Sequence, residues 1–246
     1  MDSAWLHQGA VNATLFQTTL WTTVLAAGNE SASDSDAALA RLCQRYWRPV
    51  YAYIRKRTPS REQAQDLTQG FFARLLEKKY LARAERTRGR FRSFLMTSVE
   101  NFLHDEHDRA TCQKRGGGES PSSLDVVFEG EENEPAEDLT PALAFEKRWV
   151  RTLLDEVMTQ LKREYGEGDR LTVFEHLQAH LWGEADAIPY DELSQRLGMS
   201  SVNLRVTAHR LRQRYREILR AEIAQTLASP DDIDNEISYL MRVASS

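Results

Sequence analysis

The stretch from Ile188 to Tyr215, IPYDELSQRLGMSSVNLRVTAHRLRQRY, decides the fold that the sequence predicts. Leu193 and Leu197 are four residues apart and therefore share one face of a first helix. Gly198 tolerates the positive φ that often ends a helix, and the side-chain oxygen of Ser200 can cap the helix that follows. The second helix repeats apolar residues at spacings of three and four, at Leu204, Ala208 and Leu211. The stretch therefore predicts a helix, a tight turn and a second helix.

The second of these helices is strongly basic, although the chain as a whole has a net charge of -5. Between Arg196 and Arg220 there are seven arginines and one acid, Glu217. A local excess of cations in an acidic protein is typical of a surface that binds phosphate. A helix–turn–helix can insert its second helix into the major groove of DNA. A solvated, charged helix on an ordinary helical bundle is the alternative that this segment alone leaves open.

The composition predicts a soluble, cytoplasmic protein of the all-α class. Of the 246 residues, 41% are hydrophobic and 28% are charged, which suits ordinary cores. No run approaches the roughly eighteen apolar residues of a membrane helix, and residues 1–16 lack the pattern of a secretion signal. Cys43 and Cys112 are isolated thiols that indicate neither a disulfide framework nor a CxxC site. Helical periodicity dominates the chain, whereas alternating β-branched runs are nearly absent.

The pattern along the chain predicts two small helical domains joined by a flexible acidic linker, and the C-terminal domain holds the helix–turn–helix. Residues 116–138 begin with three glycines and contain eight acids but no lysine or arginine, a composition that cannot form a core. The predicted boundaries are 1–33 for an N-terminal extension, 34–115 for the first domain, 116–140 for the linker, 141–224 for the second domain and 225–246 for a C-terminal extension.

Local signals predict the individual helices. In the first domain, the apolar positions Leu39, Leu42, Tyr46, Val50, Tyr53 and Ile54 mark one helix. Pro49 predicts a kink or a break in it. Ser60 with Gln63 is a capping box for a second helix, and a third follows Gly89. Further along the chain, Thr140 and Ser229 each precede a proline and mark the starts of a helix in the second domain and of a last helix in the C-terminal extension. The predicted helices of the second domain are Pro141–Glu164, Asp169–Leu181, Tyr190–Leu197 and Ser201–Ala224.

Three blocks of sequence resemble bacterial sigma factors. The segment Asp66–Leu76, DLTQGFFARLL, resembles the helix with which these factors dock on the clamp helices of RNA polymerase. The segment Gly89–Ala110, GRFRSFLMTSVENFLHDEHDRA, is similar to the helix that reads and melts the minus-ten element. The segment Leu197–Arg216 is similar to the helix that reads the minus-thirty-five element. Because no third domain separates them, the chain resembles the compact extracytoplasmic-function (ECF) group.

The resemblance implies a non-enzymatic sigma factor that binds core RNA polymerase, at its clamp helices and flap, and promoter DNA. An anti-sigma or other regulatory protein is a further candidate partner. The residues expected at the polymerase are Asp66, Gln69, Phe72, Leu75 and Leu76. Those expected at the minus-ten element are Arg90, Arg92, Phe94, Asn101, Arg109, Lys114 and Arg115. Those expected at the minus-thirty-five element are Ser200, Ser201, Asn203, Arg205, Thr207, His209, Arg210, Arg212 and Arg214.

Within the last set, Asn203, Arg205 and Thr207 are expected at base edges, and Arg210, Arg212 and Arg214 along the phosphates. For the aromatic residues Phe91 and Phe94, core packing is the alternative to a stacking role. The chain also departs from the family pattern. Phe94 stands where tryptophan is usual, Val202 replaces a glycine, and Val206 with Thr207 replaces a polar pair. The promoter preference is therefore expected to differ from that of typical members.

Two other functions remain open: a stand-alone helix–turn–helix regulator, and a sigma-like adaptor without promoter recognition. Asp66–Leu76 favours the sigma factor, because a simple repressor has no need of that motif. No cofactor is predicted, because none of the phosphate-loop, dinucleotide or hydrolase motifs occurs. His104 and His107 share a helix face, but zinc would need two further converging ligands, so no metal site is predicted.

Overall fold

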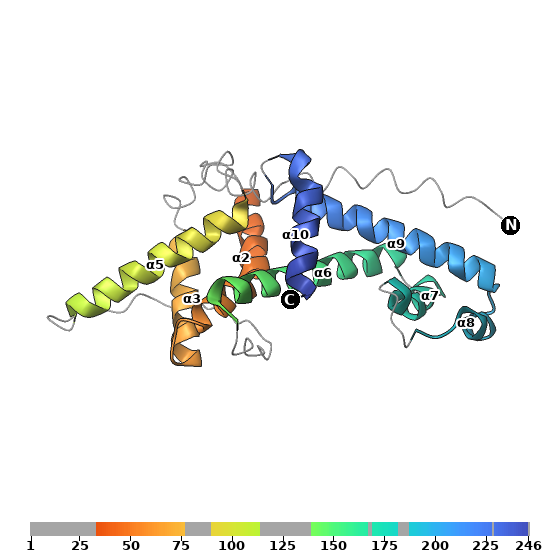
Figure 1. The fold of residues 1–246 in the computed structure, drawn as a ribbon, viewed down its shortest axis with the longest axis horizontal. Helices are drawn as coiled ribbons and strands as arrows, with labels where there is room; N and C mark the ends of the chain where they lie inside the picture. The colour runs from red at the N-terminus through yellow and green to blue at the C-terminus, as the bar shows by residue number, and fades with distance from the viewer. Residues whose placement is uncertain are drawn as a thin grey trace. The chain divides into compact units, whose positions relative to one another are not determined.

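The computed structural model describes residues 33–76, 90–113, 139–166, 169–181, 187–227 and 229–245. Every element within these ranges is a helix (Figure 1), so the predicted all-α class is confirmed. In chain order the α-helices are α2 (Ser33–Arg55), α3 (Arg61–Leu76), α5 (Phe91–Gln113), α6 (Pro141–Tyr165), α7 (Asp169–Leu177), α8 (Tyr190–Leu197), α9 (Ser201–Ala224) and α10 (Ile233–Ser245). Two short 3-10 helices, η4 (Gln178–Leu181) and η5 (Pro230–Asp232), precede α8 and α10.

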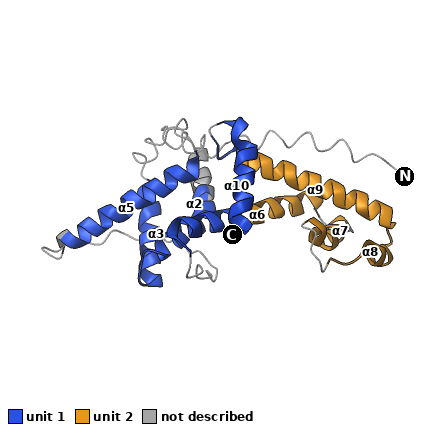
Figure 2. Cartoon of the chain, viewed as in Figure 1, with its two compact units in different colours: residues 1–150, 224–246 blue, residues 151–223 orange. Residues whose placement is uncertain are grey.

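The chain divides into two compact units, which Figure 2 shows in different colours. Unit 1 combines residues 1–150 with residues 224–246, and unit 2 consists of residues 151–223. The C-terminal extension therefore belongs to the same unit as α2, α3 and α5. The predicted acidic linker falls outside the described residues at positions 116–138, as does most of the N-terminal extension.

Unit 1 buries the apolar face that the periodicity predicts for α2. Leu42, Tyr46, Val50, Tyr53 and Ile54 are each no more than 1% exposed. Pro49 lies inside α2, which continues to Arg55, so the expected break does not occur. Proline removes one hydrogen bond from a helix, and the buried residues around it supply packing that compensates for this loss.

Aromatic contacts join the three helices of unit 1 that come first in the chain. The ring of Trp47 in α2 stacks on that of Phe72 in α3, with 5.5 Å between the centroids. Phe71 in α3 meets the ring of Phe102 in α5 edge-on at 5.7 Å. Edge-on and offset arrangements of this kind stabilise a core beyond the area that they bury.

Unit 2 is built around the apolar face of α9. Its core contains Leu204, Ala208 and Leu211 of α9 together with Leu193 of α8, Phe174 and Leu177 of α7, and Val157 and Leu161 of α6. The three α9 residues are those that the spacing predicts to face inward, and each is at most 1% exposed. This packing turns the opposite side of α9 towards solvent.

Side-chain caps fix where several helices begin. The Oγ1 of Thr140 accepts a hydrogen bond from the Leu143 amide at 3.2 Å. The Oγ of Ser60 accepts one from the Gln63 amide at 3.1 Å. The Oγ of Ser200 accepts one from the Asn203 amide at 3.2 Å. Gly198 ends α8 with φ of 64°. These contacts confirm the predicted caps, which satisfy amides that have no partner within the helix.

Within the described part of the chain, no helix is both long enough and apolar enough to cross a membrane.

Candidate nucleic-acid interface

The solvent-facing side of α9 carries most of the residues expected at the minus-thirty-five element. Asn203, Arg205, His209 and Arg210 are exposed there, and Thr207 is half-buried. The Thr207 hydroxyl donates to the Asn203 carbonyl oxygen at 2.8 Å within the same helix. Ser200 caps α9, and Ser201 is half-buried at its first position. The cations of this face can meet phosphates, while its centre is free to approach base edges.

Arg205 is held over an aromatic stack. Its guanidinium lies 5.5 Å from the centre of the Tyr190 ring. The His180 ring also stacks on the Tyr190 ring, with 4.4 Å between the ring centroids. His180 in turn donates from Nε2 to the Ile188 carbonyl oxygen at 3.0 Å. A cation placed over an aromatic face loses little freedom on binding, so this stack orients Arg205 at the start of α9.

Two of the arginines expected at phosphates make contacts inside unit 2. Arg212 is half-buried and donates from Nε to the His180 carbonyl oxygen at 3.0 Å. Arg214 makes a bidentate pair with Glu164, with both N–O distances at 2.7 Å, and also contacts Glu217. The Glu164 carboxylate raises the pKa of Arg214. Arg212 and Arg214 therefore connect α9 to other helices of unit 2. Arg214 is nevertheless exposed, as are Arg205 and Arg210, whereas Arg212 is half-buried.

The predicted polymerase-docking residues divide between the surface and the core of α3. Asp66 is exposed, while Gln69 and Leu76 are half-buried, and all three lie towards one side of the helix. Phe72 and Leu75 are 4% and 1% exposed and belong to the core. Phe72 and Leu75 are therefore out of reach of a partner, and the prediction that they contact polymerase directly does not fit their burial.

The residues expected at the minus-ten element are scattered along α5 and beyond it. Asn101 and Arg109 are exposed, and Arg109 pairs with Glu106 at 2.6 Å. Phe94 is half-buried beside Phe91, with 5.9 Å between the ring centroids. Phe91 is fully buried, so core packing describes its role. Lys114 and Arg115 lie outside the described residues.

α5 by itself is not a basic surface. It carries four acids and two arginines, and one of those arginines, Arg92, is buried. A cationic groove for melted DNA would therefore need basic residues from outside α5.

Arg92 lies in a buried ionic cluster, not on the DNA-facing surface where the sequence placed it. Its Nε is 3.0 Å from Glu146 of α6, and its Nη1 contacts Glu236 of α10. The Arg92 and Glu236 side chains are 3% and 0% exposed. Burial raises the pKa of Glu146, against the opposing effect of Arg92. A charge buried this deeply needs such partners, so Arg92 joins three helices of unit 1.

The cluster extends to further residues of α10 and α6. Arg90, also expected at the minus-ten element, places its Nε 2.9 Å from the second carboxylate oxygen of Glu236. The Arg92 guanidinium lies 5.1 Å from the centroid of the Trp149 ring and 5.0 Å from that of the Tyr239 ring. Sequence reasoning missed this arrangement. The only signal for it was an acid in an amphipathic C-terminal helix, a pattern that most surface helices share.

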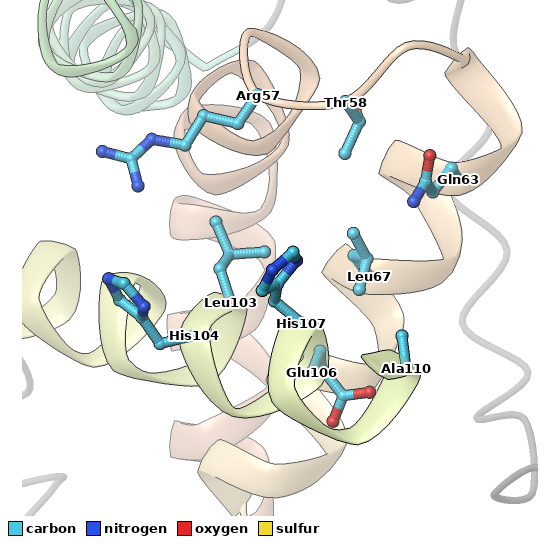
Figure 3. Close-up of a pocket in the computed structure, with 9 residues that line it drawn as sticks. All are labelled: Arg57, Thr58, Gln63, Leu67, Leu103, His104, Glu106, His107 and Ala110. Atoms are coloured by element: carbon cyan, nitrogen blue, oxygen red, sulfur yellow. The ribbon is translucent and has the colours of Figure 1, made fainter. Parts of the chain in front are cut away.

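A hollow of about 440 Å³ opens between the end of α2, the start of α3 and the second half of α5. Figure 3 shows His107 between Leu67 and Leu103, whereas Glu106 points away from them. Arg57, at the edge of the hollow, is 3.5 Å from Glu100. These polar groups are largely exposed, so the hollow lacks the enclosed apolar lining typical of a small-molecule site.

Part of the chain matches a known protein family. Residues 42–111 match the model of Sigma-70 region 2, a span that runs from α2 through α3 to α5. No curated protein and no solved structure matches the chain. Region 2 is the part of a sigma factor that binds core RNA polymerase and melts the minus-ten element, and both roles fit the segments in which the sequence resembles that family. Residues 42–111 are therefore similar to Sigma-70 region 2, and this similarity supports a sigma-70 family factor.

Proposed function

We propose that this protein is a promoter-specificity subunit of RNA polymerase of the ECF type. In this proposal α3 docks on the clamp helices of the core enzyme, the region around α5 engages the melted minus-ten element, and α9 reads the minus-thirty-five duplex. The observation that carries the proposal is the region 2 match at residues 42–111. A stand-alone regulator would have no use for a polymerase-binding domain.

The arrangement of unit 2 supports the part of the proposal that concerns duplex DNA. α8 and α9 are joined by three residues, of which Gly198 has a left-handed backbone. The exposed side of α9 presents Arg205 and Arg210 in the first half of the helix. In a helix–turn–helix, the early residues of the second helix contact base edges while nearby cations contact phosphates.

Co-elution with core polymerase tests the docking surface. The variant Asp66→Ala/Gln69→Ala is expected to weaken co-elution by about tenfold while leaving helicity by circular dichroism unchanged. Gln44→Ala, an exposed glutamine of α2, is the matched control and is expected to co-elute normally. Co-elution of the double variant at wild-type strength would exclude this face of α3.

Run-off transcription from mapped promoters separates the three functions. A sigma factor binds the core enzyme and starts transcription at defined sites. An adaptor binds the core enzyme without directing initiation, and a stand-alone regulator binds duplex DNA without the core enzyme. The proposal predicts the first result.

A further inference from the structure

We propose that Val202 and Val206 read the 5-methyl groups of thymines in the major groove and so determine part of the promoter preference. The proposal rests on the function proposed above for α9. It adds two residues whose side chains have no polar group. It also names their chemical target, the thymine methyl, which is the one apolar group that a base pair exposes in that groove.

The two valines lie at the centre of the exposed side of α9. Successive residues of an α-helix are rotated by about 100°, so Val202, Val206 and His209 fall within roughly 60° of one another. The buried residues Leu204 and Leu211 fall on the opposite side of the helix by the same rotation. A groove that receives this side of α9 therefore meets the valines first.

Their exposure is unusual for the molecule. Val202 is 65% exposed and Val206 is 43% exposed. In the part of the chain that the structure describes, they are two of the three large apolar side chains with high exposure, and the third is Met241 of α10. Exposed apolar groups cost free energy in water, and a pair of them on one functional face indicates a contact surface.

The charges on either side of the valines favour DNA over an apolar protein as the occupant. Arg205 flanks them on one side of the helix and Arg210 on the other, and both face solvent. No carboxylate among the described residues forms an ion pair with either arginine. A major groove offers this combination, because its base edges lie between two rows of phosphates. An apolar protein surface would instead have to desolvate both arginines.

Valine suits a thymine methyl for two physical reasons. Its branched side chain has few rotamers, so little conformational entropy is lost on contact. Its γ-methyl groups can bury the thymine methyl but cannot bond to the amino group of cytosine or adenine. Val202 is the second residue of α9 and Val206 the sixth, which puts both in the part of the helix that reaches base edges in this class of motif.

The test uses the full chain reconstituted with core RNA polymerase. The preferred duplex is first selected from a randomised pool, and each thymidine in the site is then replaced singly by deoxyuridine. This change removes only the methyl group. We expect one or two positions at which wild-type affinity falls about three- to fivefold, the value for one buried methyl group. Val202→Ala or Val206→Ala should remove the discrimination at one of these positions. Met241→Ala, which shortens an equally exposed side chain, should retain it.

The outcomes separate this inference from the proposed function. Enrichment of a site at which every deoxyuridine is tolerated would refute the valine readout but leave promoter recognition intact. Loss of core-enzyme binding in the valine variants would show that Val202 and Val206 contact protein, and would also refute the inference. Failure of the wild-type chain to bind the core enzyme or to enrich any site would overturn both proposals.

Discussion

The buried position of Arg92 makes a quantitative prediction. Arg92→Met keeps much of the length of the side chain but removes its charge and its contacts with Glu146 and Glu236. Two buried carboxylates then lose the cation that both of them contact. Removal of one partner from a buried ionic group costs roughly 3–5 kcal/mol. We expect about 3 kcal/mol, the lower end, because Arg90 still lies 2.9 Å from Glu236.

Urea unfolding followed by tryptophan fluorescence measures this effect. Trp149 lies 5.1 Å from the Arg92 guanidinium and so reports on the cluster directly. Because the chain forms two compact units, the transition of unit 1 must be fitted on its own. With an m-value typical of a small domain, a loss of 3 kcal/mol lowers the urea midpoint by roughly 1–3 M.

Arg109→Met is the matched control. Arg109 lies on the same helix and also pairs with a glutamate, but its side chain is 59% exposed. Exposed pairs contribute roughly 0–1 kcal/mol, so this variant should unfold close to the wild type. If Arg92→Met lost less than about 1 kcal/mol and instead weakened binding to promoter DNA, the structural role of Arg92 would be refuted.

Three further predictions concern other parts of the molecule. Burial raises the pKa of Glu146 above its usual value of 4.5. The contribution of Glu146 to stability is therefore greatest below pH 4.5 and declines as the pH rises through the raised pKa. Glu146→Gln should flatten this pH dependence of the unfolding free energy. Burial raises the pKa of the Cys43 thiol to about 11, so in a Cys112→Ser background it should react with iodoacetamide at pH 8 only after urea unfolding. Gly198→Ala should cost about 1–2 kcal/mol in urea unfolding of unit 2, because φ is 64° and the space around it is open, so the cost is purely conformational.

Local signals in the sequence were sufficient for α8 and α9 of unit 2. The predicted helix Asp169–Leu181 is instead divided into α7, which ends at Leu177, and the 3-10 helix η4. The bounds of α8 and α9 match the prediction because Gly198 and Ser200 act on neighbouring backbone groups. The same holds for the start of α6, where Thr140 caps the first turn. Such contacts span three or four residues, and a single sequence displays them completely.

Long-range contacts explain what the sequence could not predict. In a sequence, an arginine that pairs with an acid 144 positions away cannot be distinguished from an arginine that binds phosphate. The motif around Asp66 and Gln69 likewise combines surface residues with the core residues Phe72 and Leu75. Whether a residue of this motif lies at the surface or in the core depends on the packing of α3 against α2. The periodicity of α9 predicted which of its residues face solvent. It could not predict the hydrogen bond from Arg212 to the His180 carbonyl oxygen in η4.

The discontinuous unit 1 has a consequence for how the protein is made. On the ribosome, Arg92 is synthesised 54 residues before Glu146 and 144 residues before Glu236. At roughly 5–20 residues per second, the second carboxylate follows Arg92 after about 7–30 s. The region 2 helices can begin to pack in that interval, but their buried guanidinium lacks its full set of partners until α10 has left the exit tunnel. Completion of unit 1 is thereby coupled to the synthesis of α10, and a chain truncated before α10 is left with an unfinished core for cellular proteases to recognise.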